Sequence, residues 1–219
     1  MCGRYVYGPA TRDYWVDLRD FLDSLGDKYN VAPTNIVPIL KADREPAAVR
    51  WGLIPSWAKD EKIGFSSINA RSETVAEKPA FRTAFKRRRC LVLADGYYEW
   101  TGPRGDKTAH FIYMADGRPL VFYGLWESWP GPKDDPLQQP LETCTIITTA
   151  AAESVAHLHD RTPALAEVDS PPLDLWLDPE FEDYGHLQSL LEPYNGELAE
   201  RTVTKYVNKV GNEGPECLE

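Results

Sequence analysis

Short apolar runs separated by turn-forming residues are the feature of this sequence that most restricts its fold. The runs are rich in β-branched and aromatic residues, which pack well on a pleated, half-buried surface and are typical of strands. We expect strands over 35–40, 48–53, 90–94, 110–114, 120–126 and 143–149. The sequence therefore predicts an α+β fold with a mainly antiparallel β-sheet core and a few flanking helices.

Helical periodicity is confined to a few segments. Apolar residues that recur at three- and four-residue steps predict a helix, and a glycine directly after such a segment is a plausible cap. We expect helices over 13–25, capped by Gly26, around Phe81 and Phe85 just before the basic run 86–89, and around Leu187, Leu190 and Leu191.

Turn signals predict the remaining connections. Asp116-Gly117 lies between two expected strands, and because both residues tolerate positive φ it predicts a hairpin that pairs 110–114 with 120–126. Segment 130–140 contains four prolines and is expected to be a surface loop. A chain of 219 residues can build one domain, so we expect a single domain over 1–219 with a less ordered tail from about residue 212.

No segment has the roughly 18 uninterrupted apolar residues of a membrane span or the apolar run of a signal peptide. We therefore expect a cytoplasmic monomer without a membrane partner. The four cysteines are scattered without a C-x-x-C pair, and His157 and His159 lack the i, i+4 spacing of helical metal ligands. The sequence predicts free thiols, no metal and no cofactor.

The net charge of −10 argues against nucleic acid as a partner, but the charge is unevenly distributed. Residues 1–110 hold 18 of the 24 basic and 14 of the 34 acidic side chains, for a net charge of +4, and the rest of the chain carries −14. The front half could thus present a basic face to DNA.

Cys2 is the most unusual position. Removal of Met1 would leave one residue with a free α-amine and a β-thiol, whose ordinary pKa values of about 8 and about 8.5 leave both partly available as nucleophiles. An aldehyde is the natural target of this pair, because the amine forms a Schiff base and the thiol then closes a five-membered thiazolidine ring. Taken alone, a cysteine after Met1 is more often incidental.

Several other residues could serve such chemistry, and each also has a purely structural interpretation. Glu99 lies between tyrosines and a tryptophan at the end of an apolar strand, where a carboxyl group can shuttle protons or can simply face solvent. His159 could act as acid or base, or could belong to a polar network with Asp160 and Arg161. Trp57 could stack on a base or pack in the core.

Taken together, the motifs of this chain resemble the SOS-response-associated peptidase (SRAP) family of abasic-site processing proteins. The resemblance covers nearly the whole chain and rests on the order and number of its motifs. These are 1–5, 29–34, 51–57, 69–74, 89–90 with 95–100, 124–127, 145–149, 159–161 and 207–209.

The resemblance implies a role for each matching residue. Cys2 would attack the C1′ aldehyde of an abasic deoxyribose in single-stranded DNA and become a thiazolidine. Asn69 would hold the sugar, Glu99 would shuttle protons, and His159 would keep the sugar open and support reversal. The DNA contacts implied are phosphate contacts by Arg4, Asn30, Arg71 and Arg161, wedging against bases by Pro33 and Trp57, and a further contact by Thr149.

This interpretation makes the chain a DNA-damage response protein that shields the lesion, associates with the nucleoid when bound to DNA, and works near the replication machinery. Schiff-base chemistry could also cleave the strand by β-elimination, as a lyase. Two alternatives stay open. The first is a cysteine peptidase in which Cys2 attacks an acyl group, including removal of its own N-terminal residues, with His159 as base. The second is a non-catalytic binding module.

Overall fold

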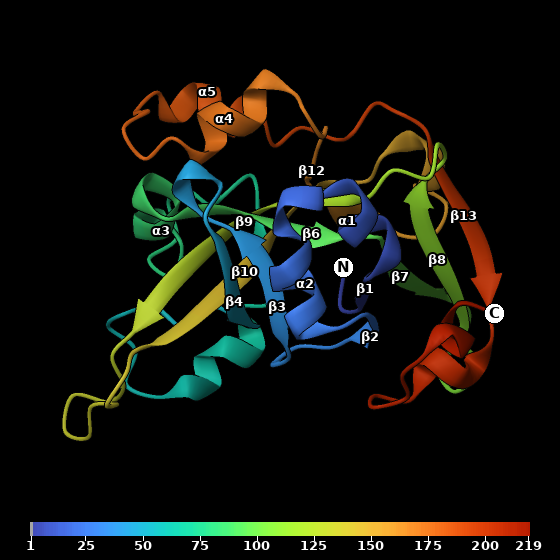
Figure 1. Ribbon diagram of the computed structural model, residues 1–219, viewed down its shortest axis with the longest axis horizontal. Helices are drawn as coiled ribbons and strands as arrows, with labels where there is room; N and C mark the ends of the chain where they lie inside the picture. The colour runs from blue at the N-terminus through green and yellow to red at the C-terminus, as the bar shows by residue number, and fades with distance from the viewer. Residues whose placement is uncertain (1) are drawn as a thin grey trace.

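Two β-sheets with short helices around them make up the structure, a computed structural model that describes residues 2–219 (Figure 1). The first sheet has five strands in the order β13-β8-β7-β1-β2. Its strands are β1 (Tyr5–Tyr7), β2 (Lys28–Val31), β7 (Gly96–Thr101), β8 (Thr108–Met114) and β13 (Leu198–Val203).

The second sheet curls into a barrel, because β10 pairs with β9 on one side and with β4 on the other. Its eight strands are β3 (Ile36–Leu40), β4 (Pro46–Trp51), β5 (Asn69–Arg71), β6 (Arg89–Ala94), β9 (Leu120–Trp129), β10 (Leu141–Ala150), β11 (Arg161–Pro163) and β12 (Leu165–Ala166). Strand β10 runs parallel to β4 and β5, and the other pairs in both sheets are antiparallel. The predicted α+β single domain with mainly antiparallel sheets is therefore confirmed.

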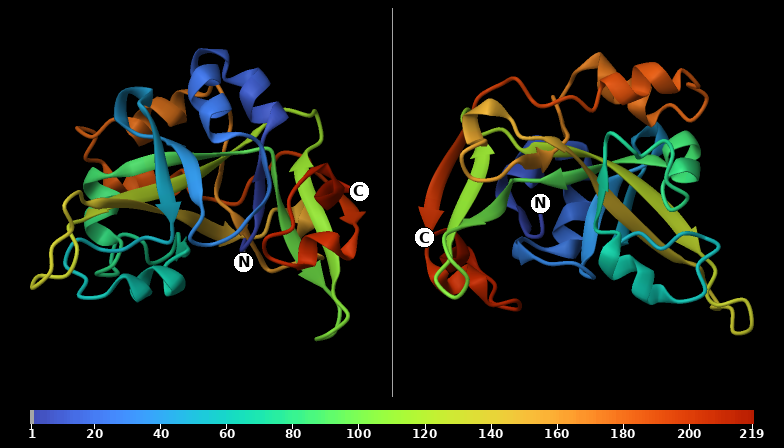
Figure 2. Two further views of the ribbon diagram at one scale, coloured as in Figure 1. Left: turned by 60° about the horizontal axis from the view of Figure 1, so that its bottom comes forward. Right: turned by 180° about the vertical axis from the view of Figure 1, so that it is seen from behind.

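The helices lie on the outside of the barrel. In the views of Figure 2, α4 and α5 lie along one side of the barrel, while β8 and β13 form the end of the molecule away from α3. The helices are α1 (Pro9–Tyr14), α2 (Arg19–Leu25), α3 (Arg82–Arg87), α4 (Pro171–Leu177) and α5 (Tyr184–Ser189), with short 3₁₀ turns η1 (Val16–Leu18), η2 (Ala42–Arg44), η3 (Glu61–Ser66), η4 (Glu153–Val155), η5 (Lys205–Asn208) and η6 (Pro215–Leu218). None of the helices described over 2–219 is long and apolar enough to cross a membrane.

The predicted helix over 13–25 is wrong in its continuity. Helix α1 begins earlier, at Pro9, and the backbone breaks at Trp15 before α2 resumes at Arg19. The start of α1 is held by Asp95, whose carboxylate accepts the amide hydrogens of Ala10 and Thr11. Both halves pack apolar side chains against the same cluster. The spacing of apolar residues therefore reflects which side chains are buried, and it does not require one unbroken helix. Gly26 ends α2 with φ 67°, as predicted.

The predicted hairpin between 110–114 and 120–126 is also wrong. Asp116-Gly117 does form a tight turn, in which the Gly117 amide donates to the Met114 carbonyl and Gly117 has φ 79°. However, both edges of β8 are already occupied by β7 and β13, and β9 belongs to the barrel. The dipeptide encodes a turn without determining which strands pair across it.

Other connections follow the sequence more closely. Segment 130–140 is the loop between β9 and β10, and the predicted helices near 81–85 and 187–191 correspond to α3 and α5. At the C-terminal end, residues 215–218 form η6 and Cys217 is fully buried. The core consists of two large apolar clusters and two small ones. Cys2 belongs to the large cluster that includes Tyr5 and Trp51, and all four cysteines are buried free thiols.

Candidate active site

The first strand fixes the position of Cys2. Strand β1 pairs antiparallel with β7, with Tyr5 opposite Tyr97, and the Tyr98 amide donates to the Arg4 carbonyl over 3.0 Å. This bond continues the contact between the two strands to Arg4, and Cys2 lies close enough to β7 for the Glu99 carboxylate to act on its thiol. The side chain of Cys2 is fully buried, with its Sγ 3.8 Å from the Arg4 carbonyl oxygen.

The surroundings of Cys2 keep its thiol protonated. Burial raises the pKa of the Cys2 thiol well above its ordinary value, and the nearby Glu99 carboxylate raises this pKa further. A thiol in this setting needs a base to take its proton before it can act as a nucleophile. Glu99, which is 5% exposed, is the acidic side chain close enough to influence it.

Asn69 holds the backbone of Cys2 from the other sheet. It begins β5, which lies parallel to β10, and its Nδ2 donates to the Cys2 carbonyl oxygen over 2.7 Å. The other end of the amide, Oδ1, is buried and has no hydrogen-bond partner among the described residues. Asn69 thus fixes Cys2 and has an acceptor available for a ligand hydroxyl group.

A cleft of about 680 Å³ opens beside these residues. It combines a carboxylate, an imidazole, an indole and two basic side chains with three small or amide residues. The lining residues are Gly3, Arg4, Glu99, Trp100, Gly105, Lys107, His159 and Asn208. The predicted residues Glu99 and His159, which are 60 positions apart in the sequence, are therefore brought to one cleft next to Cys2.

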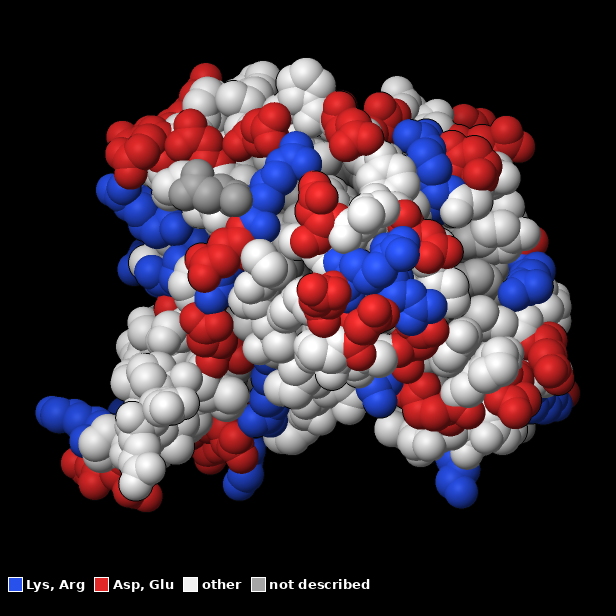
Figure 3. Space-filling model, viewed as in Figure 1, with Lys and Arg blue, Asp and Glu red and all other residues white. Residues whose placement is uncertain are grey.

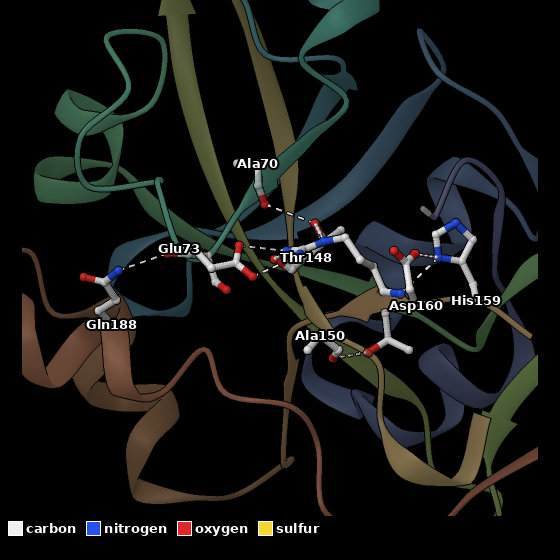
Figure 4. Close-up of polar contacts among 10 residues, drawn as sticks. Ala70, Glu73, Thr148, Ala150, His159, Asp160 and Gln188 are labelled. Atoms are coloured by element: carbon white, nitrogen blue, oxygen red, sulfur yellow. Dashed lines mark hydrogen bonds and ion pairs between the residues drawn. The ribbon is translucent and has the colours of Figure 1, made fainter. Parts of the chain in front are cut away.

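His159 is positioned by its own neighbours in sequence. Its Nδ1 lies 3.0 Å from the Arg161 amide nitrogen and 2.7 Å from Asp160 Oδ1 (Figure 4). Because one ring nitrogen cannot accept and donate a hydrogen bond at the same time, Nδ1 accepts from Arg161 when it carries no proton and donates to Asp160 when it carries one. Nδ1 thus has a partner in either case.

Arg161 points away from His159, toward Glu73. Its guanidinium forms a two-pronged ion pair with the Glu73 carboxylate at 2.8 and 3.0 Å and donates to the Thr148 carbonyl at 2.6 Å. Figure 4 shows Glu73 on one side of Thr148 and His159 with Asp160 on the other. A phosphate would have to displace Glu73 to use the full guanidinium fork.

Arg4 and Asn30 form a second buried connection. Asn30 is 2% exposed, its Oδ1 accepts from Arg4 Nη1 over 2.6 Å, and its Nδ2 donates to backbone carbonyls of Val207, Lys209 and Asn212. Asn30 therefore acts on the cleft through Arg4, and it ties the C-terminal segment to β2. The guanidinium carbon of Arg4 also lies 5.8 Å from the centre of the Trp100 ring.

The remaining predicted DNA contacts do not line the cleft. Trp57 is 60% exposed in the loop after β4, and Arg71 is exposed at the end of β5. Pro33 is half-buried in the turn after β2, next to Thr34 with φ 77°. Thr149 is buried on β10, where it pairs with Thr162 of β11.

Sequence reasoning assigned no role to Lys107 or Asn208, two of the residues that line the cleft. Asn208 Oδ1 accepts a hydrogen bond from the Trp100 indole over 2.6 Å, so it holds one wall of the cleft. Lys107 lies in a polar loop without a recognisable motif, and only the fold brings it to the site. Within 2–219, no group of three His, Cys, Asp or Glu side chains is arranged to hold a metal ion.

A family model described as SOS response associated peptidase (SRAP) matches residues 1–210. The chain belongs to this family. Among its relatives, the abasic site processing protein YoqW of Bacillus subtilis strain 168 is 42% identical, with all of this chain and 99% of the relative covered. The abasic site processing protein HMCES of Gallus gallus is 33% identical over 87% of this chain and 65% of the relative.

The SRAP fold is also found in solved structures. A crystal structure of a protein from Bacteroides thetaiotaomicron superposes with a TM-score of 0.86 at 24% identity and covers all of this chain and 99% of the other. At this identity the likeness shows the fold alone.

Proposed function

We propose that this SRAP protein processes abasic sites by capturing them covalently in single-stranded DNA. The proposal takes the α-amine and thiol of Cys2 as one nucleophilic unit and the ring-opened deoxyribose aldehyde as its target. It is supported by the names of the relatives, and by the arrangement of Cys2 with Asn69 and Glu99. Met1, whose removal frees the amine, lies outside the described residues.

The reaction balances without a cofactor. The Cys2 amine adds to C1′ of the aldehyde, and the resulting carbinolamine loses water to give an imine. The Cys2 sulfur then adds to the imine carbon while the thiol proton ends on the nitrogen, which closes the thiazolidine ring. One water is released, and no oxidant or reductant is needed.

The neighbouring groups suit these steps. Glu99 can take the proton of the buried thiol and return it to the nitrogen or to the departing water. The unpartnered Oδ1 of Asn69 can accept a hydrogen bond from a sugar hydroxyl group while Nδ2 holds Cys2. His159, whose Nδ1 has a partner with or without a proton, can exchange a proton with the sugar oxygen as the ring opens and closes.

The burial of Cys2 beside the Glu99 carboxylate, with its backbone held by Asn69, is the observation that carries the proposal, because it separates this site from that of a cysteine peptidase. A peptidase thiol is usually activated by a charge that stabilises the thiolate, whereas Cys2 is buried beside a carboxylate that disfavours it. A thiol that closes on an imine can remain protonated until the imine forms. The site therefore favours aldehyde capture over acyl transfer.

For DNA we propose that Arg4 and Lys107 face phosphates in the cleft, and that Arg71, Trp57 and Pro33 contact the strand on either side. Arg161, Asn30 and Thr149 would act by holding the walls of the site.

The test uses purified protein and a single-stranded oligonucleotide with one abasic site. Intact mass before and after incubation is expected to show loss of Met1 and an adduct equal to protein plus DNA minus one water. The adduct should survive a denaturing gel. The Cys2→Ala protein keeps the amine but cannot close the ring, so it should give an adduct only when borohydride traps the imine.

A matched control is Cys217→Ala, which removes another buried thiol and keeps Cys2. It should form the adduct as the unaltered protein does. A stable adduct from Cys2→Ala without borohydride would rule out the thiazolidine. Cleavage of a peptide substrate that depends on Cys2, without capture of abasic DNA, would favour the peptidase instead.

A further inference from the structure

Two histidines share one carboxylate at the edge of the candidate site. Glu200 on β13 lies 2.7 Å from His110 Nδ1 on β8 through one carboxylate oxygen, and 3.1 Å from His157 Nε2 through the other. The second ring nitrogen of His110 lies 2.8 Å from the hydroxyl group of Thr101 on β7. These four residues, the His110–Glu200–His157 cluster with Thr101, link three strands to the segment after η4.

This cluster borders both candidate proton-transfer groups. Glu99 on β7 lies directly opposite His110 on β8, so their side chains point to the same face of the sheet with Cβ atoms about 5 Å apart. His157 lies two residues before His159, and the same segment is tied to β13 a second time where the Leu198 amide donates to Ser154 Oγ over 3.4 Å. A change in the cluster therefore reaches Glu99 through charge and His159 through position.

The charge of the cluster depends on pH. Two imidazoles and one carboxylate carry a net charge of +1 when both rings are protonated and −1 when neither is, and histidine changes charge near neutral pH. Burial pushes the pKa of Glu200 up, but hydrogen bonds from His157 and His110 outweigh this and leave the pKa below its ordinary value. The two hydrogen bonds therefore favour the ionised form of Glu200.

We propose that His110, Glu200 and His157 act as a positioning cluster whose charge sets the protonation of Glu99 and so the pH range of adduct formation. The inference rests on the proposed function. A positive charge on the cluster favours the ionised carboxylate of Glu99, the form that accepts the thiol proton. A negative charge on the cluster favours the protonated form, which donates to departing water.

Other polar and charged groups face the same region and also contribute to the electrostatic potential at Glu99. From β7 the facing groups are Glu99 and the neutral Thr101, from β13 Glu200 and the neutral Thr202, and from the segment after η4 His157. Arg201 lies on the opposite face of the sheet, over Phe111. The cleft itself adds Arg4, Lys107 and His159.

The test measures the rate of adduct formation with abasic single-stranded DNA from about pH 5 to about pH 9, using the full chain. His110→Gln removes a positive charge from the cluster, so the midpoint of the acidic limb should rise by about 1 pH unit. Glu200→Gln removes a negative charge, so the midpoint should fall. His186→Gln on α5, where the ring contacts Phe181, is the matched control and should leave the profile unchanged.

Opposite shifts are a result that simple damage to the fold does not produce. A uniform loss of rate at every pH in both variants would overturn the proposal. If His110→Gln does not fold, His157→Gln replaces it as the test variant. His157 is 58% exposed, so its loss should raise the midpoint of the acidic limb without disturbing the core. If the unaltered protein forms no adduct, the proposed function fails. The influence of the cluster on Glu99 is then measured by following the carboxyl ¹³C chemical shift of Glu99 against pH in the unaltered protein and in His110→Gln. An identical midpoint in the two proteins would overturn the proposal about the cluster.

Discussion

Asn69 and Cys2 are 67 positions apart in sequence, yet one hydrogen bond joins the amide of the first to the carbonyl of the second. This bond lies between the two sheets, since Asn69 begins β5 and Cys2 precedes β1. The position of Cys2 therefore depends on the Asn69 side chain, whose Oδ1 remains an acceptor for a ligand.

Replacement of Asn69 by alanine should lower the rate of adduct formation about tenfold, a loss equivalent to about 1.4 kcal/mol and within the range for one hydrogen bond to a neutral group. The rate is measured on denaturing gels with excess abasic DNA. Asn195→Ala, at an exposed position, serves as the control. An unchanged rate in Asn69→Ala would mean that Cys2 is held by the sheet alone.

Gly96 illustrates how little space separates β7 from β8. A Cβ atom at this position would lie 2.6 Å from the Ile112 carbonyl oxygen and would overlap the Phe111 ring. Gly96→Ala should therefore destabilise the protein by about 1–3 kcal/mol, as overpacking of a core does. Urea unfolding measures the change. Gly185→Ala on α5, where the nearest atom is 3.5 Å away, should be neutral or stabilising. Equal effects in the two variants would contradict this account.

At the scale of single residues, side chains with reactive groups could be selected from the sequence, but the partners of other side chains could not. Cys2, Glu99 and His159 stand out because their side chains carry reactive groups, and the cleft contains or adjoins all three. The partners of Arg161 and Asn30 could not be predicted, because Glu73 is 88 residues from the first and Val207 is 177 from the second. An arginine expected to face phosphate is instead held by a carboxylate that only the fold brings near.

Among the elements, the ion pair between Arg161 and Glu73 connects β11 to the turn after β5. The Arg161 hydrogen bonds lower the pKa of Glu73, so the folded state favours the ionised carboxylate. Stability from this pair is present above the ordinary pKa of about 4.3 and is lost as the pH falls through the lowered pKa of the folded state.

Glu73→Gln should therefore cost about 1 kcal/mol at pH 7, the upper end for a pair whose carboxylate is half exposed, and progressively less as the pH falls to about 3. Unfolding free energies at the two pH values measure the difference. Glu61→Gln, which removes a carboxylate paired by a single contact to Arg50, should cost less. A cost independent of pH would show that shape rather than charge is what Glu73 contributes.

Elements themselves were predicted well where the pattern is local. Strands β6, β8, β9 and β10 include the expected segments, β3 begins one residue later than expected, and α3 and α5 lie where periodicity indicated. The two wrong predictions, the unbroken first helix and the hairpin, have one cause. Strand pairing and helix continuity depend on residues that are distant in sequence. Trp15 breaks the first helix so that both halves pack on one cluster, and the Asp116-Gly117 turn sends the chain from one sheet to the other.

At the scale of the whole molecule, the uneven distribution of acidic and basic residues along the sequence can be followed on the surface. Acidic side chains gather along the edge formed by α4 and α5, while blue and red groups are mixed over the rest of the face in Figure 3. The cleft carries Arg4 and Lys107 against Glu99. The favourable charge for a phosphate chain is therefore limited to a few side chains, and the covalent bond would supply most of the persistence of a complex.

Reversible binding of the Cys2→Ala protein to abasic single-stranded DNA should accordingly depend on salt only moderately. Each phosphate neutralised on a single strand contributes a slope of about −0.7, so three contacts give about −2 in log K against log salt. Fluorescence anisotropy measures this slope, and adding Lys107→Ala should reduce it by about 0.7. A slope that Lys107 does not change would place Lys107 outside the phosphate path. Adducts already formed by the unaltered protein should persist at any salt concentration.

The five-stranded sheet joins β1 from the start of the chain to β13 from near its end, and Arg4 is hydrogen-bonded to Val207. During synthesis on a ribosome, Cys2 emerges first, but β7, Asn69 and the wall formed by Asn208 follow only as later codons are read. A nascent chain therefore contains Cys2 before it contains the residues that bury and hold it. Because those residues come from the whole length of the chain, the surroundings of Cys2 are complete only after synthesis has passed Asn208.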